Sequence, residues 1–505
     1  MKVHLMHPDR DFDLEVPLPG NREELVDDLE LRTLVSAMAA GDPFLLDVAS
    51  RTLLTGFGAD IDTILYRQAV LKDCLANPDL ARGLYELAVE AIESRTKHWL
   101  GITSGFPGAI LRNAVATLET FMEYLDRLRA FAENYHERFQ SRGFRKFLAM
   151  CRRELTEDYL AEIRGHLRQL KFPYGVLISG SLREGNELGG YALRRLPDGQ
   201  LRWLSRVRRQ LMKLVGQRAS AYTFHIPDRD EGGARAVSSL RNRGIAAIAD
   251  VLGQSSEHVL RLFEMMRCEL AFYTGCLNLH ERLKSLGERT CFPEPSPAGT
   301  GRRHCSGLYD VCLALTLGRS VVGNTVQADD QRLVIITGAN KGGKSSFLRA
   351  IGVSQLMMQC GMFVGAESFA AETCPAIFTH YKREEDSSMK SGKFDEELSR
   401  MSIIADQIVP GSLVLFNESF AATNDREGAV IAGEITRALL ECRIKVFFVT
   451  HLNEFARDCF DSGADHFFFL RAERREDGTR TFKLTHGEPL ETSYGADVYK
   501  EVFTT

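Results

Sequence analysis

The segment Gly338-Ala-Asn-Lys-Gly-Gly-Lys-Ser345 is the strongest motif in this chain of 505 residues. It follows the β-branched run Leu333-Val-Ile-Ile-Thr337 and precedes a helical pattern that begins at Ser346. Its spacing is that of a phosphate-binding loop between a strand and a helix. Glycines let backbone N–H groups approach phosphate oxygens, and the helix N-terminus adds favourable partial charge. The segment therefore predicts a nucleotide-binding α/β domain.

Two side chains at the end of this loop have separate predicted tasks. Lys344 would reach the terminal phosphates of the nucleotide, and the Ser345 hydroxyl would hold Mg²⁺. The residues of this segment that we expect to contact ATP are Gly338, Ala339, Asn340, Lys341, Gly342, Gly343, Lys344, Ser345 and Ser346.

Short apolar runs after the loop predict the rest of the sheet. Leu413-Val-Leu-Phe416 and Val446-Phe-Phe-Val-Thr450 are continuous rather than alternating, as in parallel strands that are buried on both faces. The runs at 466–470 and 481–485 flank a polar stretch that contains Asp477-Gly478, which predicts a closing hairpin.

Polar residues at the ends of two of these runs are the candidate catalytic groups. Asn417 stands where a metal-binding aspartate is expected, and its amide brings no charge to Mg²⁺. Glu418 is the candidate base or water-orienting carboxylate. His451 follows a strand whose carboxyl end should face the ligand, so we expect it to sense the terminal phosphate; a purely structural histidine is the alternative. The predicted catalytic set is Glu418, His451 and Lys344, and the metal set is Ser345 and Asn417.

The region from about Asn21 to Leu286 has apolar residues at helical spacing. We expect long helices over 109–171 and over 256–286, the second beginning at a cap formed by Ser255 or Ser256. The Pro/Gly-rich stretch 292–301 is a candidate domain boundary.

The net charge of −5 argues at first sight against a polyanion partner, but the basic residues are unevenly distributed. The segment from Arg194 to Arg218 contains eight basic residues and a single acidic residue, Asp198, which gives it a net charge of +7. A solvated helix face is one interpretation and contact with DNA phosphates is the other. The candidate DNA contacts are Arg202, Arg206, Arg208, Arg209 and Lys213.

No signal peptide, membrane-spanning run or C-x-x-C pair is evident, and the eleven cysteines are scattered. These features predict reduced thiols, no membrane partner and a cytoplasmic location, associated with the nucleoid if the source is prokaryotic.

Five motifs resemble those of the MutS family of DNA mismatch repair and recombination proteins. The run 337–346 resembles that family's TGPNMGGKST, 361–366 its GxYVPA turn, and 413–418 its LVLxDE strand. Val449-Thr-His451 is similar to its ATH and Ser493-Tyr-Gly495 to its SYG.

This resemblance implies an all-α core and lever region followed by an ABC-type P-loop ATPase domain, which works as a homodimer. Each ATP would then also contact a serine of the partner subunit, and Ser391 is similar in placement. The implied division is a helical core start at 1–108, lever helices at 109–290 with a reduced clamp-like segment near 175–218, and the ATPase at 303–505. Too few residues precede the core for the family's mismatch-reading domain, and the chain ends soon after Ser493-Tyr-Gly495, where a dimer clasp would begin.

Three hypotheses remain from the sequence. The first is an ATPase-gated dimeric clamp on mismatched, branched or distorted DNA, acting in repair or recombination. The second is an ATP-binding scaffold that hydrolyses slowly because of Asn417 and recruits partners without recognising DNA structure. The third is phosphoryl transfer to a small molecule, for which long helical arms have no evident purpose.

Overall fold

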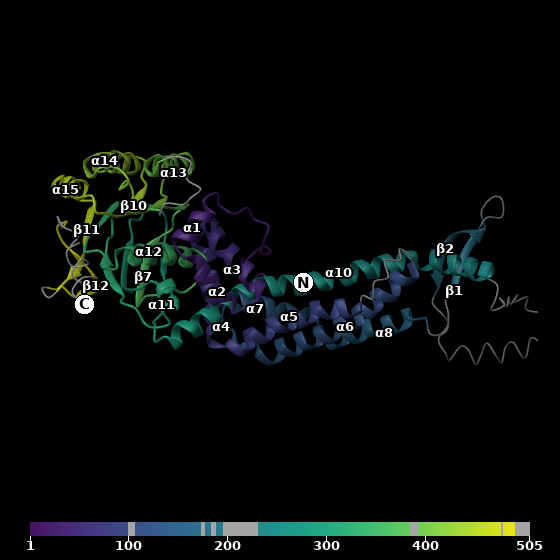
Figure 1. Ribbon diagram of the computed structural model, residues 1–505. Coiled ribbons are helices and arrows are strands. Elements are labelled where there is room, and N and C mark those ends of the chain that lie inside the picture. Colours follow the sequence, from purple (N-terminus) through teal and green to yellow (C-terminus); the bar gives the residue numbers. More distant parts are fainter. Residues whose placement is uncertain are drawn as a thin grey trace, which may run out of the picture. The chain divides into compact units, whose positions relative to one another are not determined.

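The computed structural model describes most of the chain, and many of its helices and strands are labelled in Figure 1. The described residues are 1–98, 107–172, 177–182, 188–194, 231–383, 392–475 and 478–489. They fall into two compact units. The first comprises Met1, Glu86–His136 and Leu148–Arg267, and the second comprises Lys2–Tyr85, Glu137–Phe147 and Cys268–Thr505.

Helices dominate the N-terminal half, as predicted. They are α1 Arg22–Asp28, α2 Leu31–Ala39, α3 Pro43–Thr55, η1 Gly56–Gly58, α4 Ile61–Ala76, α5 Pro78–His98, α6 Pro107–Tyr135, η2 His136–Arg138, α7 Arg142–Glu154, α8 Glu157–Leu170 and α10 Glu231–Ser285. Within the first unit, Phe263 of α10 packs against Phe121 of α6 with ring centroids 5.8 Å apart. Strands β1 Leu177–Leu182 and β2 Leu188–Arg194 pair antiparallel. Among the described helices, none is both long and apolar enough to cross a membrane.

Two of the helix predictions differ from the structure. The stretch 109–171 forms three α-helices rather than one. Asp73 accepts the N–H groups of Gln140 at 2.9 Å and Ser141 at 2.7 Å just before α7, and the Thr156 hydroxyl caps α8 by accepting the Tyr159 N–H at 3.3 Å. The predicted cap at Ser255 or Ser256 is wrong. Both serines lie inside α10, where their hydroxyls donate to the carbonyl oxygens of Val251 and Gly253, each at 2.8 Å.

A six-stranded sheet carries the predicted strand set. Its order is β12-β11-β6-β10-β9-β8, with β6 Leu333–Gly338, β8 Ile377–Tyr381, β9 Leu413–Asn417, β10 Lys445–Val449, β11 Phe467–Arg474 and β12 Arg480–His486. All pairs are parallel except β11–β12, which forms the predicted hairpin. The α/β prediction for this region is therefore confirmed.

A second sheet of four strands has the order β3-β7-β4-β5. Its strands are β3 Glu294–Ser296, β4 Arg303–Leu308, β5 Asn324–Gln327 and β7 Ser368–Glu372. Strand β3 lies inside the Pro/Gly-rich stretch 292–301 and pairs with β7, so this stretch contributes to a sheet. The domain boundaries given above stay a prediction.

Helices cover both faces of the six-stranded sheet. The remaining helices are α11 Val311–Leu317, α12 Lys344–Gln359, α13 Lys393–Gln407, α14 Asp425–Glu441 and α15 Asn453–Asp461. Alternate strand residues such as Leu333, Val414 and Phe448 form one core with apolar residues of α13, α14 and α15. On the other face α12 approaches so closely that a Cβ on Gly352 would lie 2.8 Å from Leu415.

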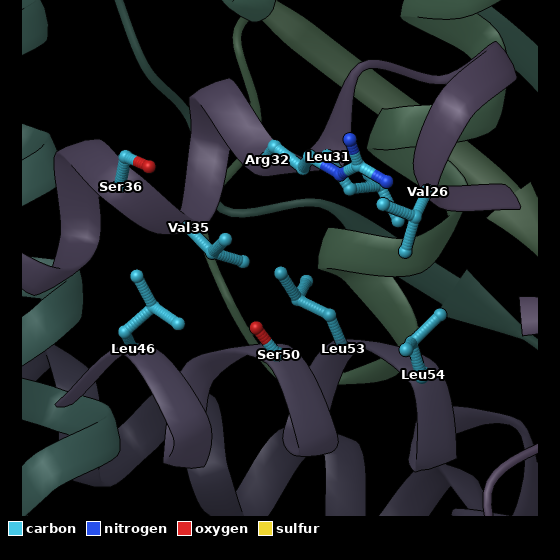
Figure 2. A pocket seen from close by; sticks show the side chains of 9 residues that line it. All are labelled: Val26, Leu31, Arg32, Val35, Ser36, Leu46, Ser50, Leu53 and Leu54. Atoms are coloured by element: carbon cyan, nitrogen blue, oxygen red, sulfur yellow. The ribbon is translucent and has the colours of Figure 1, made fainter. Parts of the chain in front are cut away.

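An apolar cavity of about 410 Å³ lies between α2 and α3 (Figure 2). Its lining residues are Val26, Leu31, Arg32, Val35, Ser36, Leu46, Ser50, Leu53 and Leu54. Only Arg32 among them is ionisable, and it forms an exposed ion pair with Asp27 at 3.0 Å. The lining therefore contains no carboxylate or imidazole that could activate the hydroxyls of Ser36 and Ser50.

A buried carboxylate anchors the N-terminal segment. Glu269 of α10 accepts N–H groups from Met6 at 3.1 Å and Phe12 at 3.3 Å, and also from Leu5. The Tyr273 hydroxyl donates to the Leu5 carbonyl oxygen at 2.7 Å. Burial raises the pKa of Glu269 to about 7, although these three N–H groups act to lower it.

We expect Glu269→Gln to change how stability depends on pH. Because the folded-state pKa lies above the unfolded value of 4.5, the folded protein binds more protons between pH 4.5 and about 7, and the Glu269 contribution to stability falls as pH rises through this window. The difference in unfolding free energy between wild type and Glu269→Gln should therefore shift by about 2 kcal/mol between roughly pH 5 and 8. Urea unfolding at several pH values measures it.

The matched control is Glu264→Gln, which changes an exposed glutamate of the same helix and should keep the wild-type pH profile. A Glu269→Gln protein with the wild-type profile would contradict the prediction.

Candidate functional site

The glycine-rich loop joins β6 to α12, as predicted. Gly343 caps α12 with φ +89°, a left-handed conformation that suits glycine. Gly342 is needed for a different reason, since a Cβ there would lie 2.7 Å from the Ala472 Cβ and 2.8 Å from the Ala339 carbonyl oxygen. The β11–β12 hairpin, which contains Ala472, thus packs directly against the loop.

Lys344 is buried at the start of α12. Its ammonium donates to the carbonyl oxygens of Gly338 and Ala339, each at 2.9 Å, which leaves one of its three N–H groups for a ligand. Burial lowers the pKa of Lys344 to about 8, while the charge of Glu418 opposes this shift. A desolvated cation beside backbone N–H groups at a helix N-terminus suits a bound phosphate.

The two residues predicted to hold Mg²⁺ meet in the structure. The Ser345 hydroxyl donates to Asn417 Oδ1 at 2.9 Å. Both offer neutral oxygen atoms, which are suitable Mg²⁺ ligands when nucleotide phosphates supply the negative charge. Among the described residues, no group of three or more His, Cys, Asp or Glu side chains could hold a metal ion by itself.

Glu418 and His451 also come together. Glu418 Oε1 lies 3.0 Å from His451 Nε2, and this hydrogen bond is the largest cause of the lowered pKa of Glu418, with burial acting in the opposite direction. The Glu418 backbone has φ +56°, and its N–H donates to the Val449 carbonyl oxygen at 2.8 Å. Non-glycine residues rarely adopt this φ, so the neighbouring strand end holds the carboxylate in place.

The structure adds support residues that the sequence analysis missed. Burial lowers the pKa of His380 in β8 to about 4. Ring Nε2 donates to the Glu397 carbonyl oxygen at 3.0 Å, and Nδ1 lies 2.7 Å from the Ser419 hydroxyl, which donates to the His380 carbonyl oxygen at 2.5 Å. His380 thereby holds the chain just after Glu418. A histidine inside an apolar strand run was the available signal, but it did not indicate which residue it would contact.

A cavity of about 450 Å³ adjoins the glycine-rich loop. Its lining residues are Leu308, Tyr309, Asp310, Leu313, Leu317, Arg319, Ser320, Val321, Val322, Asn324, Gly343, Ser346, Phe347 and Phe482. Phe482 of β12 is 47% exposed at this cavity and has φ +58°. Asn324 secures it, since its amide donates to the Phe482 carbonyl oxygen at 3.3 Å and accepts the Leu484 N–H at 2.7 Å.

Several predicted residues lie outside the part of the chain that the structure describes. They are Ser391, Arg202, Arg206, Arg208, Arg209, Lys213 and the Ser493-Tyr-Gly495 motif. Of the predicted clamp-like segment near 175–218, only β1 and β2 are described.

Comparison with known families accounts for most of the chain. The family model described as the MutS2 N-terminal domain matches residues 59–286, and that of MutS domain V matches residues 334–504. This chain belongs to the MutS family. The family resemblance is thereby confirmed. MutS domain V is an ATPase domain, and MutS-family proteins bind ATP.

Named relatives match over part of their length. MutS protein homolog 4 of Mus musculus is 24% identical over 366 residues, which cover 69% of this chain and 36% of that protein. The DNA mismatch repair protein MutS of Parabacteroides distasonis is 36% identical over 145 residues, 28% of this chain and 17% of that protein. The corresponding protein of Thermotoga maritima is 34% identical over 137 residues, which cover 27% of this chain and 17% of that protein. This chain therefore matches well under two thirds of each relative.

Gly342→Ala should destabilise the protein, because the added methyl group collides with Ala472. We expect a loss of about 1–3 kcal/mol in unfolding free energy, measured by urea denaturation. Gly433→Ala in α14 is the matched control. Its Cβ would meet nothing closer than 3.9 Å, so it should stabilise by up to about 1 kcal/mol through helix propensity. Equal stability of the two variants would refute the assigned contact.

Proposed function

We propose that this protein is an ATP-dependent DNA-binding protein of the MutS type with an ABC-type P-loop ATPase. One observation carries the proposal: Lys344, the Ser345–Asn417 pair and the Glu418–His451 pair converge at the carboxyl edge of β6, β9 and β10. Ligands of open α/β sheets bind at that edge. A glycine-rich loop alone would support only phosphate binding, whereas this convergence also supports hydrolysis.

The nucleotide would place its phosphates on the glycine-rich loop and its nucleoside in the adjoining cavity. Gly343 and Ser346 line the cavity and belong to the loop and the start of α12, so the two sites are continuous. The buried Tyr309 hydroxyl has no hydrogen-bond partner among the described residues and would donate to, or accept from, the nucleoside. The exposed Phe482 ring would stack on the base.

In the hydrolysis that we propose, Glu418 orients the attacking water and His451 fixes the Glu418 carboxylate while it faces the γ-phosphate. Lys344 and the N-terminus of α12 stabilise the charge that develops on the phosphate oxygens. Mg²⁺, held by Ser345 and Asn417, would add charge neutralisation there.

We also propose that the protein forms a homodimer and that it binds DNA. Two relatives named above are DNA mismatch repair proteins, which supports a role in repair or recombination on mismatched, branched or distorted DNA. A homodimer through the ATPase would bring Ser391 of one subunit to the ATP of the other. The +7 segment 194–218 supplies the charge that phosphate binding needs.

One observation favours the alternative of a slowly hydrolysing scaffold. Asn417 is neutral and accepts a hydrogen bond from Ser345, so this site lacks the charge of the usual metal-binding aspartate. Binding of ATP would then act mainly as a signal for partner recruitment.

Glu418→Gln should separate hydrolysis from binding. We expect kcat to fall by about 10²- to 10⁴-fold, because the amide cannot take up a proton, while ATP affinity changes little. Phosphate release and equilibrium ATP binding are the two measurements. Glu427→Gln, an exposed glutamate of α14, is the control and should keep wild-type activity. If wild type, with or without DNA, is no faster than Glu418→Gln, the scaffold alternative is correct.

Replacement of Arg206, Arg208 and Arg209 by Ala should weaken DNA binding at every sequence. Each lost phosphate contact should also lower the slope of log affinity against log salt by about 1. Titration of labelled duplex and four-way-junction DNA at several salt concentrations, with and without ATP, measures both effects. The control is Arg22→Ala with Arg32→Ala, since both arginines are exposed and paired with nearby acids. If the triple variant keeps the wild-type affinity and salt slope, the proposal that this segment acts as a DNA clamp is wrong.

A further inference from the structure

The C-terminal end of α10 places Glu288 at a defined point. Gly287 adopts φ +78° and its N–H donates to the Lys284 carbonyl oxygen at 3.1 Å. The Glu288 N–H donates to the Leu283 carbonyl oxygen, also at 3.1 Å. These two bonds form a Schellman cap, which satisfies the last carbonyl groups of the helix. The backbone of Glu288 is therefore fixed to the helix end rather than to a free loop.

The Glu288 side chain reaches the wall of the cavity that adjoins the glycine-rich loop. Its Oε1 accepts the Val321 N–H at 2.7 Å, a short bond to a charged acceptor. Val321 belongs to the segment 318–323 between α11 and β5, which we call the wall segment; Arg319, Ser320, Val321 and Val322 of this segment line the cavity. The wall segment has no regular secondary structure, so side-chain contacts must set its position.

The end of the wall segment nearest β5 is held separately. A Cβ on Gly323 would lie 2.5 Å from the Gly307 carbonyl oxygen, so the two backbones touch, and Lys483 donates to the Gly323 carbonyl oxygen. These contacts do not involve the cavity-lining residues 319–322 directly. The Glu288 bond fixes the middle of the wall segment.

Glu288 also influences Tyr309, the other polar group of the cavity. Burial raises the pKa of Tyr309 well above its usual range, and the negative charge of Glu288 adds to this shift. The carboxylate thus holds the Val321 amide by a hydrogen bond and acts on Tyr309 through its charge. It is not itself among the cavity-lining residues.

We propose that Glu288 is a positioning residue for the nucleoside of the bound nucleotide: its bond to the Val321 N–H holds the wall segment at the spacing that the nucleoside requires opposite Phe482. This inference rests on the proposed function. The backbone of Glu288 is fixed by the helix cap, and its side chain holds the cavity wall. Binding of a nucleoside in the cavity is therefore coupled to the geometry at the end of α10, and the coupling acts in both directions.

The test compares ATP with inorganic triphosphate, which can occupy the glycine-rich loop but not the cavity. In Glu288→Ala we expect the Kd for ATP to rise about 10-fold, the effect of losing a hydrogen bond to a charged group, and the Kd for triphosphate to stay within about 2-fold. Glu288→Gln keeps a neutral acceptor and should give an intermediate ATP affinity. KM should rise while kcat stays within about 2-fold, since Glu418 and Lys344 are untouched.

Arg289→Ala is the matched control at the same helix end. It removes an exposed ion pair with Glu367 at 3.0 Å and should leave both affinities unchanged. Thermal unfolding of each variant shows whether the fold is intact, and Glu288→Gln serves as the test if Glu288→Ala unfolds.

Each outcome is decisive. A Glu288→Ala protein that binds ATP like wild type, or that loses ATP and triphosphate affinity equally, would overturn the positioning role while the proposed function stands. A wild-type protein that binds neither ATP nor triphosphate would overturn the proposed function and this inference together. Selective loss of ATP affinity supports both.

Discussion

Parallel pairing of β6, β10 and β9 is the constraint on which the rest of the site depends. Val449 is paired with Ile336 on one side and with Asn417 on the other, so β9 and β10 end level while β6 continues to Gly338. Hydrogen bonds continue this alignment past the strands, from the Thr450 N–H to the Ile336 carbonyl oxygen at 3.1 Å and from the Glu418 N–H to Val449. The residues that follow each strand must then meet at one edge.

The closing hairpin adds a second constraint, because it supports the loop and shapes the cavity at the same time. Ala472 of β11 lies against the glycine-rich loop, and Phe482 of β12 borders the adjoining cavity. Asn324 joins β5 of the second sheet to β12 with one donated and one accepted bond. Hydrogen bonds therefore link the small sheet to the hairpin, and the buried bond from the Leu484 N–H to Asn324 holds its geometry well, while the hairpin packs against the loop.

Several predictions came directly from local pattern. The strands around 333–337, 413–416 and 446–450 and the hairpin were each found within a few residues, because continuous apolar runs bounded by turn residues leave few alternatives. The start of α7 within the stretch 109–171 was missed, since the Asp73 carboxylate that accepts the Gln140 and Ser141 N–H groups lies far away in the sequence. The serines at 255 and 256 are good caps in isolation, but helical residues on both sides continue the helix.

By itself the sequence determined the glycine-rich loop and the strand set, and it predicted the site residues Lys344, Ser345, Asn417, Glu418 and His451, because these depend on residue type and spacing along one segment. Only the tertiary structure decided that Ser345 pairs with Asn417, that Glu418 pairs with His451, and that Phe482 and the Glu288-held wall flank one cavity. These pairings join strands and loops separated by tens of residues. Their geometry follows from sheet register and helix packing, which no local pattern encodes.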